Sequence, residues 1–290
     1  MQSRPRKNNR RADPSRRRHD SRRLHDSPGR RGSSARPDED HASDIPVIVG
    51  RHPVLEALRS GRPIDRLWMQ QGLLEGSLRE IAALAHERRI FLKEVPKAFL
   101  DRMAEGLAHQ GVGAQVAIKP TLDFDEWSGV LQSLTAPFVY ILDGIQDPHN
   151  LGAILRTADA TGAAGVVIPE RGASSLTAVV AKASSGAIEY VSVVRVTNLA
   201  QTIDKMKKLG VFVYAAHPTA PTLYTAVDWS GPVGLVIGSE GLGIRPLVRE
   251  RCDGLVRLPM LGQVASINAS NAAAVIGFEV IRQRAGKTQY

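Results

Sequence analysis

Three short segments in the second half of the chain carry polar residues among glycines and alanines. They are residues 143–163 (DGIQDPHNLGAILRTADATGA), 236–253 (VIGSEGLGIRPLVRERCD) and 258–271 (LPMLGQVASINASN). Their amide, guanidinium, carboxylate and hydroxyl groups belong to Asn150, Arg156, Glu240, Ser266 and Asn268. The surrounding sequence reads as alternating strands and helices, and ligands of such α/β proteins bind at the carboxyl ends of strands. We therefore expect these five side chains to form one polar site.

Common nucleotide and metal signatures do not account for these segments. A dinucleotide-binding loop has the spacing G-x-G-x-x-G after the first strand, whereas Gly238, Gly241 and Gly243 reverse that spacing and follow a late strand. A phosphate-binding loop is excluded at the C-terminus, because Ile281 stands where its first glycine belongs. The histidines do not pair with acidic residues at metal-ligand spacing, so we expect no metal site.

Composition limits the class of protein. The chain has 290 residues, 43% of them hydrophobic, and contains no run of 18 uncharged apolar residues, so we predict no membrane span. The single Cys252 excludes an internal disulfide framework and a cysteine-based zinc site, and we interpret it as a small core residue or an inert thiol. These features predict a cytoplasmic protein.

The positive charge is concentrated at the start of the chain. Residues 1–44 hold 13 basic and 7 acidic residues, so they contribute +6 to the net charge of +9. They lack aromatic residues and contain a single leucine, which is too little apolar surface to offset the entropy of ordering. We predict a disordered, arginine-rich tail that tethers RNA through phosphate contacts, with a merely solubilising tail as the alternative.

The rest of the sequence indicates two α/β parts. Residues 45–120 predict a small α/β module, whose last strand we place at 115–118. Residues 121–136 contain a helix-like stretch and form the predicted linker. From Pro137 to residue 290, continuous apolar strands, one of them expected at 190–194, alternate with helices. Such strands are typical of a mostly parallel sheet covered by helices on both faces.

The three polar segments resemble the three motifs of the SpoU (TrmH) family of RNA ribose 2'-O-methyltransferases, within the SPOUT superfamily. The first is N-x5-R from Asn150 to Arg156, the second is G-[SA]-E-G-x-G at 238–243, and the third is P-x-x-G-x-x-x-S-[LI]-N from Pro259 to Asn268. Residues 45–120 are similar to the family's RNA-binding extension in the phrases VGRHPVLEALRSG and HQGVGAQV. This combination most resembles the branch that methylates a guanosine of 23S rRNA.

The resemblance implies a fold, a cofactor and a partner. The C-terminal part would form a parallel-sheet SPOUT domain with a deep trefoil knot, a topology that periodicity cannot predict. S-adenosylmethionine, with no metal, would bind in a bent shape against the knot loops. The residues implied in its binding are Gly238, Leu258 and Ile267, through their backbone groups, with Ala215, Ala216, Met260 and Gly262 nearby. The protein would be a homodimer with its active site near the subunit interface, where residues 268–277 pack closely.

The implied chemistry is methyl transfer from a sulfonium to a ribose 2'-hydroxyl. Arg156 would activate the hydroxyl as a base, with help from a substrate phosphate, or would stabilise the developing alkoxide, since a guanidinium stays protonated. Asn150 would orient Arg156 or the ribose, unless it only caps its helix, a position that Asn favours. Glu240 would fix its loop or be a solvated turn residue.

Two further side chains of the motifs also have alternative roles. Ser266 and Asn268 would hold the third motif beside the methyl donor or serve as a cap pair of the last helix. Asn271 stands where the family commonly has an apolar residue, and if buried it needs a hydrogen-bond partner.

Three functions are therefore compatible with the sequence. The leading one is 2'-O-methylation of a guanosine in 23S rRNA. The second keeps this chemistry but acts on tRNA or on an antibiotic-binding rRNA nucleotide. The third is an RNA-binding or ribosome assembly protein without catalysis, and the intact Asn150, Arg156 and Glu240 argue against it.

Overall fold

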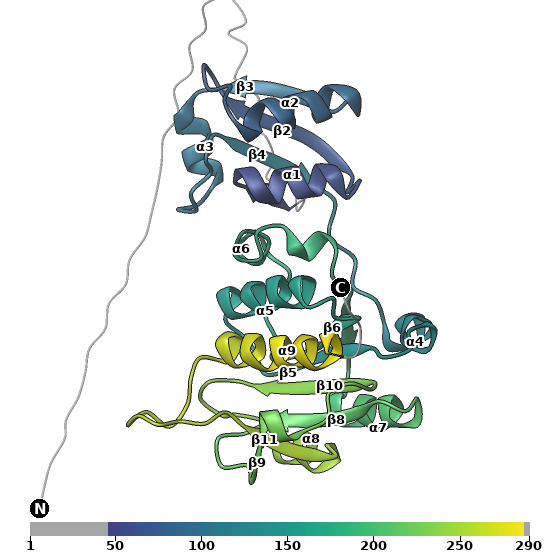
Figure 1. Ribbon diagram of the computed structural model, residues 1–290. Helices are drawn as coiled ribbons and strands as arrows, with labels where there is room; N and C mark the ends of the chain where they lie inside the picture. The colour runs from purple at the N-terminus through teal and green to yellow at the C-terminus, as the bar shows by residue number, and fades with distance from the viewer. Residues whose placement is uncertain (1–45, 287–290) are drawn as a thin grey trace, which may run out of the picture. The chain divides into compact units, whose positions relative to one another are not determined.

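The computed structural model describes residues 46–286, which form two β-sheets with their helices (Figure 1). The basic tail predicted to be disordered, residues 1–44, lies outside the described residues. Within the described range, no helix combines the length and the apolar character that crossing a membrane requires.

The first sheet has four strands in the order β1-β4-β2-β3. Strands β2 and β3 are parallel, and the other two pairs are antiparallel. The strands are β1 (Val47–Val49), β2 (Ile64–Gln70), β3 (Phe91–Val95) and β4 (Val112–Val116), and the helices are α1 (Arg51–Arg59), α2 (Ser77–Glu87) and α3 (Lys97–Met103). Helices α1 and α2 contact each other and bury Leu58, Leu78 and Ile81 completely.

The last strand of this sheet begins earlier than the sequence predicted. We expected a strand at 115–118, with Gly113 in the loop before it, whereas β4 begins at Val112 and contains Gly113. A Cβ at Gly113 would lie 3.0 Å from the Met103 sulfur of α3. The glycine therefore leaves room for the Met103 side chain of α3 to approach the strand closely.

The second sheet has seven strands in the order β7-β6-β5-β10-β8-β11-β9, and all of its strand pairs are parallel. The strands are β5 (Phe138–Asp143), β6 (Gly165–Pro169), β7 (Val193–Val196), β8 (Phe212–Ala216), β9 (Thr222–Leu223), β10 (Val233–Gly238) and β11 (Gly254–Arg257). The strand expected at 190–194 begins three residues later, because Ala187–Glu189 forms a 3-10 helix that delays it. The predicted parallel α/β architecture is confirmed.

Helices cover both faces of the seven-stranded sheet. Phe138, Tyr140 and Leu142 of β5 share a core with α5 (Pro148–Ala160) and α9 (Ala269–Ala285). The intervening Val139 and Ile141 share a second core with α4 (Phe124–Ser133), α7 (Leu199–Lys208) and α8 (Pro246–Arg251). Figure 1 shows α5 and α9 side by side, and they are in contact. The period-two alternation of a buried strand thus builds three layers.

The segment predicted as a linker, residues 121–136, packs against this sheet. Helix α4 begins with a capping box, in which the Asp123 carboxylate accepts from the Glu126 backbone N–H and the Glu126 carboxylate accepts from that of Asp123. Trp127 is completely buried and donates its indole N–H to the Ala164 carbonyl at 3.1 Å. Leu122 also forms a parallel bridge with Val194. The segment is therefore part of the second core.

The strand order contains crossovers, since β10 lies between β5 and β8 in the sheet. Strand order alone does not define a knot, because the same neighbours can be reached by a threaded or an unthreaded chain. The trefoil knot stays a prediction.

The contact between α9 and β5 depends on Gly277. The Tyr140 hydroxyl donates to the Ala273 carbonyl at 3.0 Å, and a Cβ at Gly277 would lie 1.9 Å from that hydroxyl oxygen. Gly277→Ala should therefore lower the free energy of unfolding by about 1–3 kcal/mol, as overpacking does, in urea denaturation. Adding Tyr140→Phe removes the clashing oxygen and should recover part of this loss.

Gly129 provides a matched control for that substitution. It lies inside α4, and no atom lies within 4 Å of a Cβ at this position. Gly129→Ala should stabilise the protein by about 0.5–1 kcal/mol, because alanine loses less backbone entropy in a helix. Equal effects of the two glycine substitutions would contradict the packing of α9 on β5.

Candidate active site

The three polar segments meet at the carboxyl ends of the parallel strands. The Asn150 amide donates from Nδ2 to Glu240 Oε1 at 2.9 Å. Asn268 donates from Nδ2 to Asn150 Oδ1 at 2.8 Å and to Glu240 Oε1. One side chain from each motif thus joins a single hydrogen-bonded cluster, which we call the Asn150–Glu240–Asn268 cluster.

The helix starts explain how these amides are positioned. The N-cap of α5 is Asp147, whose carboxylate accepts from the His149 backbone N–H at 2.9 Å. The alternative in which Asn150 only caps this helix is therefore wrong, and its buried amide is available to Glu240. Asn268 is the N-cap of α9, because its Oδ1 accepts from the Ser270 backbone N–H at 2.9 Å. It caps the helix and joins the cluster at the same time.

The polar side chain of Asn271 is not buried, so it does not need a hydrogen-bond partner inside the protein. Its side chain is exposed on the first turn of α9, and its backbone N–H donates to Asn268 Oδ1 at 3.3 Å. The departure from an apolar residue at this position is therefore compatible with the fold.

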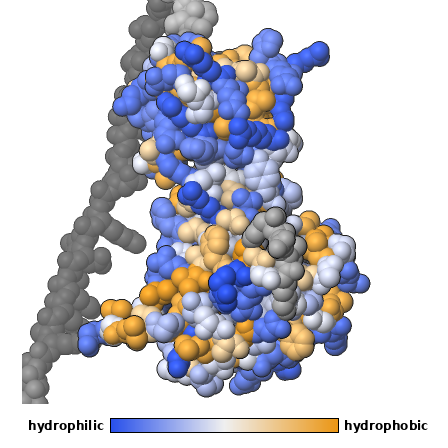
Figure 2. All heavy atoms as spheres, viewed as in Figure 1, coloured by the Kyte–Doolittle hydropathy of each residue, from blue (hydrophilic) through white to orange (hydrophobic). Residues whose placement is uncertain are grey.

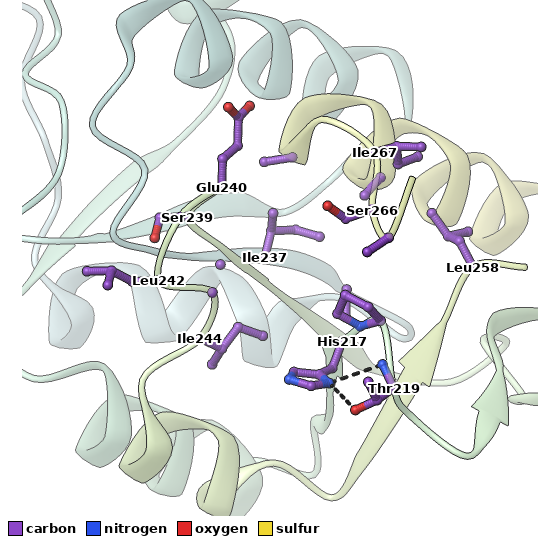
Figure 3. Close-up of a pocket in the computed structure, with 18 of the residues that line it drawn as sticks. His217, Thr219, Ile237, Ser239, Glu240, Leu242, Ile244, Leu258, Ser266 and Ile267 are labelled. Carbon is purple, nitrogen blue, oxygen red and sulfur yellow. Dashed lines mark hydrogen bonds between the residues drawn. The ribbon is translucent and has the colours of Figure 1, made fainter. Parts of the chain in front are cut away.

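A first cavity of about 340 Å³ opens beyond the ends of β8, β10 and β11 (Figure 3). Its lining comprises residues 216–219, 237–244, 256, 258, 260, 265–267, 269 and 272. Figure 3 shows Ile237, Leu258 and Ile267 around the hollow, with Glu240 and His217 at opposite ends. Most of the wall is apolar and the polar groups are few, which is the usual composition of a small-molecule site.

Most of the residues expected to bind a cofactor line this cavity. They are Ala216, Gly238, Leu258, Met260 and Ile267, and the expected catalytic residues Glu240 and Ser266 line it too. Ala215 and Gly262 are not in the lining; Ala215 is completely buried inside β8, and Gly262 is exposed.

Sequence reasoning missed residues 217–219, which also line the first cavity. The His217 Nδ1 accepts from the Thr219 backbone N–H at 3.3 Å and lies 3.0 Å from its hydroxyl oxygen. These contacts fix the imidazole ring at the end of the cavity. The sequence signal that could have found them is their position directly after the apolar run at 211–216.

The glycines of the second motif allow its loop to close tightly. Ser239 and Gly243 exchange backbone hydrogen bonds at 3.2 and 2.9 Å, and Gly243 has φ of +65°. A Cβ at Gly238 would lie 2.4 Å from the Gly243 carbonyl carbon. Glycine is therefore required at the base of this loop by close backbone approach and at its end by a left-handed conformation.

Arg156 does not join the cluster within one chain. Six residues along a helix correspond to about 9 Å of rise and a rotation of about 240° from Asn150. The exposed Arg156 instead donates from Nη1 to the Ser185 hydroxyl at 3.3 Å, and it does not line the first cavity. The structure thus unites four of the five expected catalytic residues around one loop and leaves the fifth on another side of α5.

A second cavity, of about 450 Å³, lies beyond the ends of β5, β6 and β10. It shares the five residues 239–243 with the first cavity. Its floor contains Asp143, which is 1% exposed and accepts from the Arg245 backbone N–H at 2.8 Å and from its Nε at 2.7 Å. The loop after β10 therefore forms a wall between two neighbouring cavities.

No group of three His, Cys, Asp or Glu side chains within the described residues has the arrangement that a metal ion needs. The one cysteine, Cys252, is mostly buried, and burial raises the pKa of its thiol to about 12. Its thiol is therefore protonated at neutral pH and a poor nucleophile.

Two family models match this chain. Residues 137–278 match the SpoU rRNA methylase family, and residues 47–122 match the substrate-binding domain of RNA 2'-O ribose methyltransferases. The chain is 45% identical over 238 residues to a Bacillus subtilis (strain 168) protein assigned to the TrmH family of tRNA/rRNA methyltransferases, a match that covers 82% of this chain and 95% of that protein. The chain belongs to the SpoU (TrmH) family of RNA methyltransferases.

Solved structures share this fold. The SpoU methyltransferase AviRb from Streptomyces viridochromogenes, in complex with S-adenosylmethionine, has a TM-score of 0.71 at 25% identity, covering 83% of this chain and 90% of its own. An rRNA methyltransferase from Sinorhizobium meliloti, also bound to S-adenosylmethionine, has a TM-score of 0.67 at 25% identity, covering 81% and 86%. The predicted family, the parallel α/β fold and the RNA methyltransferase activity are confirmed at the level of the family.

The Asn150–Glu240 contact makes a prediction of its own. Asn150→Asp replaces the donating amide with a carboxylate facing Glu240, so it should lower the free energy of unfolding by about 1–3 kcal/mol. Combining it with Glu240→Gln supplies a new amide donor and should restore most of the loss in a double-mutant cycle. An Asn150→Asp variant as stable as the wild type in urea denaturation would show that this contact does not form in solution.

Proposed function

We propose that the protein methylates the ribose 2'-hydroxyl of an RNA nucleotide with S-adenosylmethionine as the methyl donor. The observation that carries this proposal is the Asn150–Glu240–Asn268 cluster, whose Glu240 lines the first cavity. A small, mostly apolar cavity suits a nucleoside-based cofactor, and the adjoining polar cluster suits a hydroxyl substrate.

The first cavity fits S-adenosylmethionine in size and in donor set. Its volume of about 340 Å³ is within the usual range for small-molecule sites. Gly241 and Gly243 have open space where a Cβ would project, so their backbone groups are accessible to a ligand. Gly238, Leu258 and Ile267 would hold the cofactor through their backbones, and His217 offers an imidazole edge. AviRb, of similar fold, was crystallised with this cofactor.

The proposed reaction transfers one methyl group. When bound, S-adenosylmethionine supplies an electrophilic methyl carbon on a positively charged sulfur. The ribose 2'-oxygen forms a bond to this carbon while the carbon–sulfur bond breaks, its electron pair remains on sulfur, and the hydroxyl proton leaves to water or a phosphate oxygen. Asn150 and Asn268 hold the Glu240 carboxylate in place, and this arrangement positions the loop that lines the first cavity.

We infer that the protein is a homodimer whose active site takes Arg156 from the partner subunit. Arg156 lines neither cavity of its own chain, yet a guanidinium suits the developing alkoxide. Exposed apolar side chains support an interface: Val275 and Phe278 of α9 are 43% and 53% exposed, and Leu261 is 99% exposed. Leu261 lies in the loop before α9, which projects from the body in Figure 1, and Figure 2 shows hydrophobic surface in this region.

The favoured substrate is a guanosine of 23S rRNA. The substrate-binding match at residues 47–122 supports an RNA, and the family name of the relatives, tRNA/rRNA methyltransferase, leaves the kind of RNA open. A tRNA or an antibiotic-binding rRNA nucleotide is the second candidate. An assembly protein without catalysis is disfavoured, because the hydrogen-bonded cluster and the cavity are both intact.

The activity can be tested with purified protein, isotope-labelled methyl donor and unmodified transcripts of 23S rRNA and tRNA. We expect labelled ribose in the 23S transcript, mapped to one guanosine by nuclease digestion and mass spectrometry. Label confined to tRNA would select the second candidate. RNA binding without methyl transfer to either transcript would overturn the enzymatic function.

The role of Arg156 can be tested in mixed dimers. Arg156→Ala should lower the methylation rate about 10²-fold or more, since it removes a charge that stabilises the transition state. A heterodimer of one Arg156→Ala and one Glu240→Ala subunit, purified through two tags, has one intact site if Arg156 acts across a symmetric interface. It should then regain about half of the wild-type rate. An inactive heterodimer would place Arg156 in its own subunit's site.

A further inference from the structure

The turn that follows helix α6 (Ala178–Ala183) carries the hydroxyl that Arg156 contacts. Helices α5 and α6 are in contact, and a Cβ at Gly152 of α5 would lie 2.4 Å from the Ala183 Cβ. The glycine therefore allows the end of α6 to pack directly on α5. Arg156 follows Gly152 by four residues, which is about one helical turn, so both lie on the same side of α5. This packing brings Ser185, two residues after Ala183, beside the guanidinium.

Ser185 has an unusual backbone conformation for a residue that is not glycine. Its φ is +53°, in the left-handed region, and the next residue, Gly186, has a φ of +90°. The Ser185 backbone N–H donates to the Lys182 carbonyl at 3.0 Å, which holds the turn in this shape. A left-handed serine costs free energy that a glycine would not. Residues kept in such conformations cluster at functional sites, so the side chain of Ser185 is a candidate for a role in the reaction.

The Ser185 hydroxyl is a neutral partner for a charged group. It accepts from Arg156 Nη1 at 3.3 Å, which uses one of the several N–H groups of the guanidinium. Among residues 46–286, no carboxylate forms an ion pair with Arg156. A carboxylate in this place would offset the positive charge, whereas a hydroxyl leaves it available to an anionic group. The contact therefore restrains the side chain without neutralising it.

We propose that Ser185 is a positioning residue for Arg156, whose guanidinium it holds in the orientation that the reaction needs. This inference rests on the proposed function and adds to it a residue outside the three motifs. An arginine side chain has several rotatable bonds, and restraining them before the reaction removes an entropy cost from the transition state. Ser185 does not touch the reacting atoms, so it acts only through Arg156.

Three substitutions at this position separate the hydroxyl from the backbone conformation. Ser185→Ala removes the hydroxyl and keeps the cost of the left-handed conformation, whereas Ser185→Gly removes both. Ser185→Asn keeps a polar acceptor, and asparagine tolerates this conformation. Ser133→Ala is the control, because Ser133 is an exposed serine of α4 whose hydroxyl donates to the Val130 carbonyl of its own helix.

The first measurement is steady-state methylation of the transcript that the wild type methylates, together with the Tm of each variant. We expect Ser185→Ala and Ser185→Gly to lower kcat about three- to tenfold, as the loss of one typical hydrogen bond predicts, with KM for RNA unchanged within about twofold. Ser185→Asn should recover part of this loss, and Ser133→Ala should match the wild type. Ser185→Gly should have a higher Tm than Ser185→Ala, so activity follows the hydroxyl while stability follows the backbone.

A double-mutant cycle tests whether Ser185 acts through Arg156. Adding Ser185→Gly to Arg156→Ala should lower kcat by less than about twofold, because no guanidinium is left to position. A further loss as large as in the wild-type background would show that Ser185 acts on the fold or on another group, and the proposal would be overturned.

A measurement without methyl transfer separates this inference from the proposed function. In protein whose arginines carry a nitrogen isotope, the Nε–H signal that disappears in Arg156→Ala reports by NMR how far the Arg156 side chain is restrained. Its order parameter should fall in Ser185→Gly and stay at the wild-type value in Ser133→Ala. An unchanged order parameter, or a Ser185→Gly protein with the wild-type kcat, would overturn the proposal. If no transcript is methylated, the proposed function fails and the order parameter alone decides whether Ser185 holds Arg156.

Discussion

The site depends on one carboxylate that two amides hold. Glu240 projects from a loop that closes on itself through two glycines, and Asn150 and Asn268 reach it from the first turns of two different helices. A hydrogen bond to a charged group is stronger than one between neutral groups. Three segments that are far apart in sequence are thereby fixed at one edge of the sheet, and both cavities take their shape from the loop that carries Glu240.

Much of this arrangement could be predicted from residue types. The period of the apolar residues gave the parallel sheet, and the positions of Asn150, Glu240 and Asn268 after strands gave their convergence. The direction in which each side chain leaves its helix was harder to predict. Asn150 and Arg156 lie in one motif and on one helix, yet their side chains leave the helix in different directions. Their spacing within one motif suggests that they act together, whereas the rotation of side chains around the helix places them on different sides of α5.

Other features depend on strand order, which periodicity does not encode. Arg171 and Arg245 reach the same cavity because β10 lies beside β5 in the sheet, although β10 comes much later in the chain than β5 and β6. His217 directly follows the apolar run at 211–216, but only the pairing of β8 with β10 brings it to the first cavity. Short elements such as β9 and α8 carry too few residues for a period to be recognised.

The burial of Trp127 has a consequence for where the catalytic half begins. The family match starts at residue 137, but the indole of Trp127 fills space under the sheet and satisfies the Ala164 carbonyl. A fragment cut at Pro137 would expose the hydrophobic underside of β5 and β6 to water and leave that carbonyl without its donor. A fragment that keeps this packing must therefore start ahead of Leu122, whose isolated bridge to Val194 joins the segment before α4 to the sheet.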